Sequence, residues 1–377
     1  MRVLLVTRRG IWRFAGGEQT QIMNTRRHLE VLGLEVGQVE DLPNDYRRYD
    51  VIHFFALDHD HIAKIKAARG VVKVLSPIYW DRYQSFGDIW QGRRPPALAR
   101  RLLKLRGSLA RRRARRNAAT GHGHVPAGRP ARPVDSGGLE GFAAFQEVID
   151  LVEFFLPNSE MEMASVQRNY VMAEPPRYAV VHNGIDEAQL DARSEWYEQR
   201  FGDMRAVVSS AGIEVRKNQC GLVRALWEVD VPIILAGQIR DQGYYLVLEW
   251  LMRRRPGVYL TGHLEPADLN SLYHHAAVHA LPSYHETPGI SNLEAIAHGC
   301  PNVSTKIGGL EEYVGPHSLY CNPYHGGHIR DQVLAALVMP RNTEGAAYVR
   351  SRYTWENCAK ETLAGYEQAL SLGGPRH

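Results

Sequence analysis

The stretch 281–301 reads LPSYHETPGISNLEAIAHGCP. An apolar strand over 278–281 ends where this stretch begins, and its second half is predicted to be a helix that ends at Gly299. Glu286 lies in the loop between them, and Glu294 follows eight residues later in the first turn of the helix. In open parallel α/β sheets, ligands bind where strands end and helices begin, because helix N-termini offer free N–H groups to phosphate. The stretch therefore predicts a parallel sheet with a ligand site at the carboxyl end of a strand.

The second half of the chain alternates between strands and helices ahead of this stretch. Strands are predicted over 206–211, 232–236, 258–261 and 278–281, and helices over 218–227, 245–253 and 269–276. Alternation of this kind is typical of a doubly wound parallel sheet.

The first half of the chain has the same alternation. It begins with an apolar run over 2–7, then a loop with Gly16 and Gly17, then apolar residues at helical spacing up to Gly33. Further strands are predicted over 34–39, 51–55 and 71–75. A second doubly wound domain is therefore expected here.

The length of 377 residues suits two domains, each large enough to bury its own core. The expected fold class is α/β, with two doubly wound domains that face a cleft. We expect an N-terminal domain over 1–186, a C-terminal domain over 187–352, and a helix within 353–377 that packs back on the N-terminal domain.

Positive charge is concentrated in one segment. No acidic residue lies between Asp88 and Asp135, yet this interval holds 13 of the 45 lysines and arginines. The rest of the chain therefore has 32 basic and 41 acidic residues. Its first part, 95–116, has a leucine stripe among arginines, which favours an interfacial helix attracted to anionic lipid or a grip for a polyanionic acceptor. A disordered basic insertion over about 93–138 explains the same composition equally well.

The four cysteines are scattered, without a pair or a companion histidine at metal-ligand spacing. We therefore expect reduced cysteines, no metal site and a cytoplasmic location, with peripheral attachment to the inner face of the membrane as the alternative. The apolar opening is too short for a signal peptide or a membrane span. The spacing G-x-G-x-x-G is absent after the first strand, which disfavours a dehydrogenase.

The run 281–301 resembles the signature of retaining glycosyltransferase family 4, LPS-x-x-E-x-x-G-L/I-x-x-L-E-A-x-A-x-G-x-P, and Glu286 and Glu294 match its E-x7-E pair. Shorter runs are similar to other family segments in the same order, namely Gly16-Gly17-Glu18, Asp50-Val-Ile-His53, His182-Asn-Gly-Ile-Asp186, Arg216-Lys217-Asn218, and Gly308-Gly309 with Glu312. The resemblance covers nearly the whole chain. It implies the GT-B fold, in which an N-terminal Rossmann-like acceptor domain faces a C-terminal Rossmann-like donor domain.

The resemblance also implies roles for residues. Glu286 would contact hydroxyls of the donor sugar and Glu294 those of the ribose. Arg216 and Lys217 would hold the diphosphate and, with Glu286, form the catalytic set. The other donor-binding positions would be Gly289, Ile290, Ser291, Gly16 and Gly17.

The reaction implied is the transfer of a sugar from a nucleoside diphosphate sugar to an acceptor hydroxyl, with retention of configuration and without metal or cofactor. The acceptor would be a glycan, a lipid-linked molecule or a small molecule, and no nucleic acid is expected as a partner. Cations and helix N–H groups suit this chemistry, because negative charge develops on the departing diphosphate.

The sequence departs from the family pattern at three places. Gly212 stands where many members have an arginine that shares the diphosphate, no histidine follows the strand over 71–75, and Pro288 has no N–H to donate within the donor loop. Because the histidine is missing, Asp81, Tyr79 and His53 are the candidates for the polar group of the N-terminal domain. The loop over 8–13 adds Trp12, which suits a sugar face, and Arg13, which suits an anion.

Simpler interpretations remain for individual motifs and for the chain. Ser291-Asn-Leu-Glu294 is by itself a capping box, and Arg216-Lys217 matches an ordinary exposed basic pair. For the whole chain, the alternatives are a sugar-nucleotide epimerase or hydrolase on the same fold, and a catalytically weak partner subunit that binds nucleotide or membrane.

Overall fold

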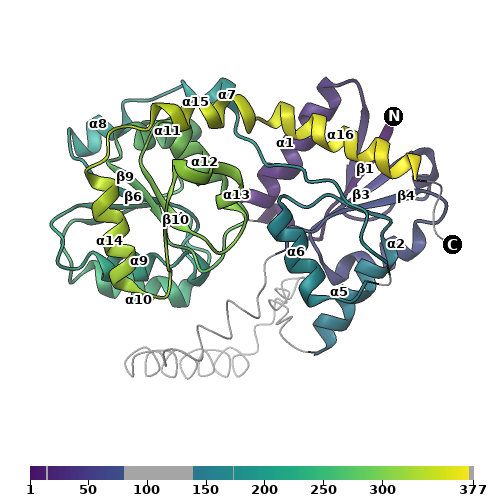
Figure 1. The fold of residues 1–377 in the computed structure, drawn as a ribbon, viewed down its shortest axis with the longest axis horizontal. Coiled ribbons are helices and arrows are strands. Elements are labelled where there is room, and N and C mark those ends of the chain that lie inside the picture. The colour runs from purple at the N-terminus through teal and green to yellow at the C-terminus, as the bar shows by residue number, and fades with distance from the viewer. Residues whose placement is uncertain (14–15, 80–138, 173, 373–377) are drawn as a thin grey trace, which may run out of the picture.

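The computed structural model describes residues 1–13, 16–79, 139–172 and 174–372, and these form two α/β lobes (Figure 1). The predicted insertion over 93–138, including the predicted membrane-binding segment 95–116, lies entirely outside the described residues. In the part that is described, no helix combines the length and the apolar character needed to cross a membrane.

The N-terminal lobe is built on a five-stranded parallel sheet in the order β2-β1-β3-β4-β5. Its strands are β1 (Arg2–Val6), β2 (Glu35–Val39), β3 (Val51–Phe55), β4 (Val72–Ser76) and β5 (Phe154–Phe155). Its helices are α1 (Gly17–Val31), α2 (Ile62–Ala67), α5 (Leu139–Leu151) and α6 (Glu160–Asn169), with 3-10 turns η1 (Ile11–Arg13), η2 (Tyr46–Arg48) and η3 (His59–His61).

The C-terminal lobe is built on a six-stranded parallel sheet in the order β11-β10-β9-β6-β7-β8. Its strands are β6 (Val207–Ser210), β7 (Ile233–Ala236), β8 (Val258–Gly262), β9 (Val278–Leu281), β10 (Asn302–Thr305) and β11 (Leu319–Cys321). The helices around it are α7 (Glu187–Leu190), α8 (Trp196–Phe201), α9 (Gln219–Ala225), α10 (Gln242–Met252), α11 (Pro266–His275), α12 (Ile290–Ala297), α13 (Leu310–Val314), α14 (Gly326–Leu337) and α15 (Thr343–Arg352), with 3-10 turns η4 (Val215–Lys217) and η5 (Gly315–His317).

The predicted alternation of strands and helices is confirmed in both lobes. The apolar run of β3 is buried at all five positions, because helices cover both faces of a parallel sheet and each side chain of the strand meets apolar neighbours. The same reason explains the buried run of β9, which leads into the stretch 281–301.

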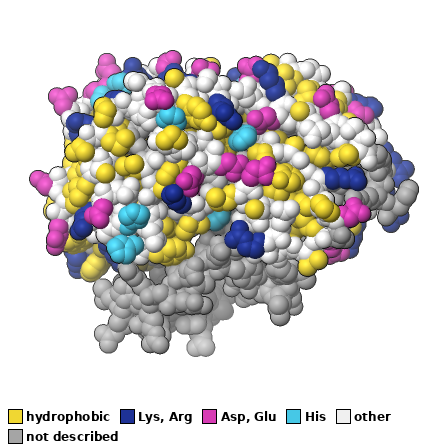
Figure 2. Space-filling model, viewed as in Figure 1, with side chains coloured by type: hydrophobic (Ala, Val, Ile, Leu, Met, Phe, Trp, Pro, Cys, Tyr) yellow, Lys and Arg dark blue, Asp and Glu magenta, His cyan; other side chains and the backbone are white. Residues whose placement is uncertain are grey.

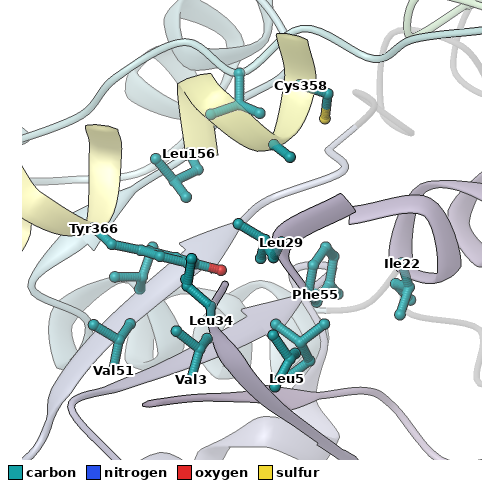
Figure 3. Close-up of a cluster of buried hydrophobic side chains, with 14 of the residues drawn as sticks. Val3, Leu5, Ile22, Leu29, Leu34, Val51, Phe55, Leu156, Cys358 and Tyr366 are labelled. Carbon is teal, nitrogen blue, oxygen red and sulfur yellow. The ribbon is translucent and has the colours of Figure 1, made fainter. Parts of the chain in front are cut away.

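The last helix, α16 (Trp355–Ser371), belongs to the core of the N-terminal lobe and lies beside α1 (Figure 1). Figure 3 shows Tyr366 and Cys358 above the side chains of the first strands, with Leu29 between them and the sheet. The hydroxyl of Tyr366 shares a hydrogen bond of 2.7 Å with Nδ1 of His53 on β3.

Two segments cross between the lobes side by side. The amide of Ile185 donates to the carbonyl of Tyr353 (2.9 Å), and Ile185 forms an isolated parallel bridge with Thr354. A Cβ on Gly184 would lie within 2.6 Å of the backbone of Thr354, so this position requires glycine. The crossing is therefore a paired connection rather than a single linker.

Charge on the described surface is mixed. On the face drawn in Figure 2, acidic and basic side chains are interspersed over both lobes instead of gathering into one patch of a single sign. The strong excess of positive charge found in the sequence falls on 93–132, outside the described residues.

Candidate active site

A cleft of about 430 Å³ is lined by residues of both lobes. Its walls come from the loops that follow β1 and β5 in one lobe and β6, β7, β8 and β9 in the other, which are the carboxyl ends of the strands. The predicted residues that line it are Arg216, Lys217, Glu286, Glu294, Gly289, Ile290, Ser291, Gly16 and Gly17. All nine predicted donor-side residues therefore face one space.

A buried ion pair lies at the base of the cleft. Nζ of Lys217 donates to both carboxylate oxygens of Glu286, at 2.9 and 2.7 Å, and Oγ of Ser283 donates to the second of them at 2.8 Å. Burial alone would raise the pKa of Glu286, but the charges of Lys217 and Arg216 lower it to about 2. Glu286 is therefore a carboxylate at every pH at which the protein is expected to work.

The second cation is held beside this pair. Arg216 donates to Oε1 of Glu214 (2.9 Å) and to the carbonyl of His285 (3.2 Å), and its guanidinium lies 3.5 Å from Glu286. Its backbone carbonyl accepts from the amide of Tyr284 at 2.8 Å, which fastens η4 to the loop of Glu286. The interpretation as an ordinary exposed basic pair is wrong, because Lys217 is buried and Arg216 is half-buried.

Glu294 is held by a buried polar network rather than by a helix cap. The hydroxyl of Tyr273 on α11 donates to Oε2 of Glu294 (3.1 Å) and shares a hydrogen bond of 2.6 Å with Oγ of Ser210, which in turn contacts Nε2 of His279 at 3.0 Å. Burial raises the pKa of Glu294 to about 7. The carboxyl group therefore changes charge near neutral pH.

The capping-box interpretation of Ser291 and Glu294 is wrong. Helix α12 begins at Ile290, so that Ser291 is already inside its first turn, and its N-cap residue is Gly289 with φ of 79°. Glycine adopts this left-handed conformation without a steric penalty, which lets the helix start one residue before the serine. The Glu294 side chain is therefore available to the cleft.

Amide side chains and one ion pair form the N-terminal wall. Arg8 and Glu18 pair at 2.8 Å, and Nε2 of Gln21 donates to Oδ1 of Asn158 at 3.0 Å. Asn183 lines the same wall with an exposed fraction of 3%, and its Oδ1 has no hydrogen-bond partner within the described residues. A buried acceptor without a partner is costly, so this oxygen is suited to a hydroxyl group of a ligand.

Comparison with known proteins identifies the lobe that carries most of these groups. Residues 205–338 match the family model of glycosyl transferases group 1. Over these residues the C-terminal lobe is similar to the glycosyl transferases of group 1. The D-inositol 3-phosphate glycosyltransferase of Mycobacterium bovis is 27% identical over 252 residues, which are 60% of this chain and 50% of that protein. The chain spans about half the length of the curated relatives it matches.

Solved structures resemble the whole chain. Sucrose-phosphate synthase from Thermosynechococcus elongatus aligns with a TM-score of 0.71 and 15% identity over 99% of this chain and 100% of that one. The Anabaena protein HepE, solved in complex with UDP, aligns with a TM-score of 0.66 and 15% identity over 98% and 100%. These likenesses confirm the predicted GT-B fold, in which two Rossmann-like domains face each other.

The three acceptor-side candidates whose side chains are described do not line the cleft between the two lobes. His53 is 1% exposed in the core, where Nε2 contacts Ser76, and Tyr79 is buried, with its hydroxyl accepting from Asn169. Trp12 is 40% exposed on η1 and is not among the lining residues. The side chain of Arg13 and the whole of Asp81 lie outside the described part of the chain.

Residues that the sequence did not indicate line the N-terminal wall and two positions of the C-terminal lobe: Gln21, Asn158, Asn183, Tyr273 and Arg240. His53 occupies a strand that is buried on both faces, so its place in the D-x-x-H run could not tell whether it faces ligand or core. Within the described residues, no group of three or more His, Cys, Asp or Glu side chains is placed to hold a metal ion.

Proposed function

We propose that this chain is a glycosyltransferase that moves a sugar from a nucleoside diphosphate sugar to an acceptor hydroxyl. The observation that carries the proposal is the buried Lys217–Glu286 pair beside Glu294 at the base of one cleft. The ionised carboxylate offers acceptor oxygens to sugar hydroxyls, and the buried cation beside it offers positive charge to phosphate. The complex of HepE with UDP supports a nucleoside diphosphate as the donor's leaving group.

The proposed chemistry needs positive charge at the diphosphate. When the bond from the sugar to phosphate breaks, negative charge grows on the departing diphosphate, and cations fixed in advance stabilise that charge. Lys217 and Arg216 are fixed by Glu286 and Glu214 before the donor arrives. We therefore propose that these side chains stabilise the departing diphosphate without a metal ion.

The two domains take different substrates in this proposal. The domain over 187–352 binds the donor, and the domain over 1–186, completed by the helix within 353–377, receives the acceptor. Gln21, Asn158 and Asn183 support this division, because neutral amides can donate to and accept from the hydroxyls of a glycan or a polyol without adding charge. Retention of configuration is proposed on the resemblance of the run 281–301 alone.

The test is turnover of a panel of nucleoside diphosphate sugars by the purified chain with pooled glycan, lipid-linked and small-molecule acceptors. Formation of a glycosylated product with the donor's anomeric configuration, read by NMR, is expected, and chelator should leave the rate unchanged. Free sugar without any acceptor product would favour a hydrolase, and an isomerised sugar nucleotide would favour an epimerase. No turnover until a second protein is added would favour the partner-subunit role.

We further propose that the segment 95–116 attaches the enzyme to an anionic membrane surface. The leucine stripe and arginines of its sequence support this. Vesicles with anionic lipid should sediment the full chain at low salt and release it at high salt, whereas a chain without 95–116 should stay in solution. Equal sedimentation with neutral vesicles would contradict the proposal.

A further inference from the structure

Arg240 lies in the cleft on a loop that the sequence did not connect with the site. This loop joins β7 to α10 and is fastened to the segment that follows β6. The amide of Ile213 donates to the carbonyl of Gln238 at 2.8 Å, and the amides of Arg240 and Asp241 both donate to the carbonyl of Ile213 at 3.1 Å. These bonds hold the base of the arginine next to Gly212.

Two glycines make room for the guanidinium group of Arg240. A Cβ on Gly212 would lie 2.6 Å from Nε of the arginine, and a Cβ on Gly16 in the other domain would lie 2.6 Å from its Nη2. Neither glycine has a φ in the left-handed region, so backbone conformation does not require glycine at either place. Glycine is instead required at both positions because a side chain there would overlap with the guanidinium group of Arg240.

The guanidinium therefore occupies the volume that a side chain at position 212 would fill. It also extends from the C-terminal domain to the loop of Gly16, which precedes helix α1 in the N-terminal domain. A ligand that binds Arg240 in this cleft would be held close to both domains at once.

The charges nearby indicate which ligand this cation would take. Lys217 and Arg216 are each bonded to carboxylates, so part of their charge is already balanced before any ligand arrives. A diphosphate carries more than one negative charge, and a planar guanidinium matches phosphate oxygens with two parallel N–H donors.

We propose that Arg240 binds the diphosphate of the donor, and that it supplies from the β7–α10 loop the guanidinium that position 212 does not. The proposal rests on the proposed function of the cleft and adds a third cation to it. The absence of an arginine at position 212 would suggest a catalytically weak partner subunit, and Arg240 removes that argument.

The test measures nucleoside diphosphate affinity in variants that remove and relocate the guanidinium. The ligand is whichever of UDP, GDP, ADP and CDP binds the wild-type chain most tightly by calorimetry, and its parent nucleoside is titrated in parallel. Arg240→Gln should weaken diphosphate binding roughly tenfold to a hundredfold and leave nucleoside binding unchanged. The matched control is Arg253→Gln at the C-terminal end of α10, an exposed arginine paired with Glu249, which should change neither affinity.

Moving the guanidinium from position 240 to position 212 separates the effect of its charge from the effect of the loop that carries it. Gly212→Arg alone forces two side chains into one space and should weaken diphosphate binding. The double variant Gly212→Arg with Arg240→Gly places one guanidinium in that space from the neighbouring loop, and should bind diphosphate at least tenfold more tightly than Arg240→Gly alone, a gain on the scale of one charge-assisted hydrogen bond.

The outcomes test the role of Arg240 separately from the proposed glycosyltransferase function. Unchanged diphosphate affinity in Arg240→Gln, or an equal loss for diphosphate and nucleoside, would overturn the role of Arg240 and leave the function standing. If the wild-type chain binds none of the nucleoside diphosphates, the proposed function and this inference both fail.

Discussion

Glu286 keeps its negative charge in a buried loop because its partners are fixed around it. Its two oxygens accept three hydrogen bonds, two from Lys217 and one from Ser283, and Arg216 lies within 3.5 Å. Burial lowers the pKa of Lys217, and the charge of Arg216 acts in the same direction, while Glu286 opposes both. Each member of the pair therefore stays charged because the other member is charged.

Replacing Glu286 by glutamine tests this dependence. The amide keeps the shape of the side chain but has one acceptor oxygen and no charge, so we expect donor turnover to fall at least ~100-fold. Circular dichroism should establish that the variant is folded, since a buried cation that loses its partner destabilises a protein strongly. The matched control is Glu311→Gln, which removes an exposed pair with Lys306 and should leave turnover nearly unchanged. Near-normal turnover in folded Glu286→Gln would refute the donor role.

Glu294 differs from Glu286 in that no cation among the described residues pairs with it. Its pKa of about 7 is set by burial, and the hydrogen bond from Tyr273 opposes that rise only in part. Below pH 7 the carboxyl group is mostly protonated, and one of its oxygens then carries a hydrogen and is a weaker acceptor. Both oxygens become available to ribose hydroxyls only when the proton leaves.

Donor affinity should therefore rise with pH through about 7 and level off above it, by about tenfold between pH 6 and pH 8. Calorimetric titration of nucleoside diphosphate across this range measures the rise. Glu294→Gln should bind roughly tenfold to a hundredfold more weakly at pH 8 and should lose this pH step, while its melting temperature does not fall. An identical pH profile in both proteins would assign the step to the nucleotide's own phosphate.

The charged residues that we assign to the donor could be picked out from the sequence because they lie in contiguous runs. Glu286 and Glu294 share one stretch, and Arg216 and Lys217 are adjacent. Arg240 could not be predicted in this way, because its place in the cleft depends on two loops that are distant in sequence and joined through Ile213. The role of Asn183 could not be predicted either, since its segment was recognised only by its similarity to a family segment.

At the scale of elements, the loop of Glu286 is held by a neighbouring turn. The amide of Glu286 donates to the carbonyl of Ile307 at 2.9 Å, and the amide of Gly309 donates to the carbonyl of Glu286 at 3.2 Å. Between them, Gly308 has φ of 118°, and a Cβ there would lie 1.7 Å from the carbonyl oxygen of Glu286. The loop after β9 and the turn after β10 are therefore one unit.

Gly308→Ala should displace the Glu286 loop and lower both stability and donor turnover. A left-handed conformation costs an alanine on the order of 1–2 kcal/mol, and the overlap with the Glu286 carbonyl adds to this. The control is Gly315→Ala, at a glycine with φ of 44° and no atom within 4 Å of the added Cβ, which should lose stability but keep its turnover. Equal turnover in the two folded variants would mean that the turn does not position Glu286.

The elements themselves were largely predictable, and their ends were less so. Apolar runs and glycine stops located β3 and β9 within a residue of where they lie. The start of α12 was misjudged, because Ser291 is a good cap by type whereas the left-handed Gly289 begins the helix earlier. Local chemistry suggests a cap, but the backbone path through the cleft decides which residue provides it.

At the scale of the whole molecule, buried histidines make stability depend on pH. Burial lowers the pKa of His53 to about 3 and those of His61, His279 and His298 to about 4, so these side chains stay neutral when folded and gain a proton on acid unfolding. Glu162 and Glu294 act in the opposite sense, because burial raises their pKa to about 7 and they lose a proton on unfolding. Between pH 4.5 and 6.5 the unfolded state therefore binds about two protons more than the folded state.

The free energy of unfolding should accordingly rise with pH in this window, by roughly 2.7 kcal/mol per pH unit. Urea unfolding at pH 5.0, 5.5 and 6.0 measures the slope. Glu294→Gln removes one of the opposing groups and should make the slope roughly one and a half times as steep. A slope of zero or of opposite sign in the wild-type chain would show that the buried histidines are already charged in the folded state.

The place of α16 in the N-terminal core has a consequence for synthesis on the ribosome. Residues of the first sheet leave the exit tunnel early, but Tyr366, which bonds to His53, follows only after the whole second domain, roughly ten to forty seconds later at usual elongation rates. During that interval the nascent first domain exposes the apolar surface that α16 will cover. Ribosome-bound chains arrested with residue 352 outside the tunnel should therefore be cleaved by protease in their first half, and those with residue 372 outside should resist. Resistance in both would mean that the first domain completes its core without its last helix, so that the part translated first would not have to wait for the part translated last.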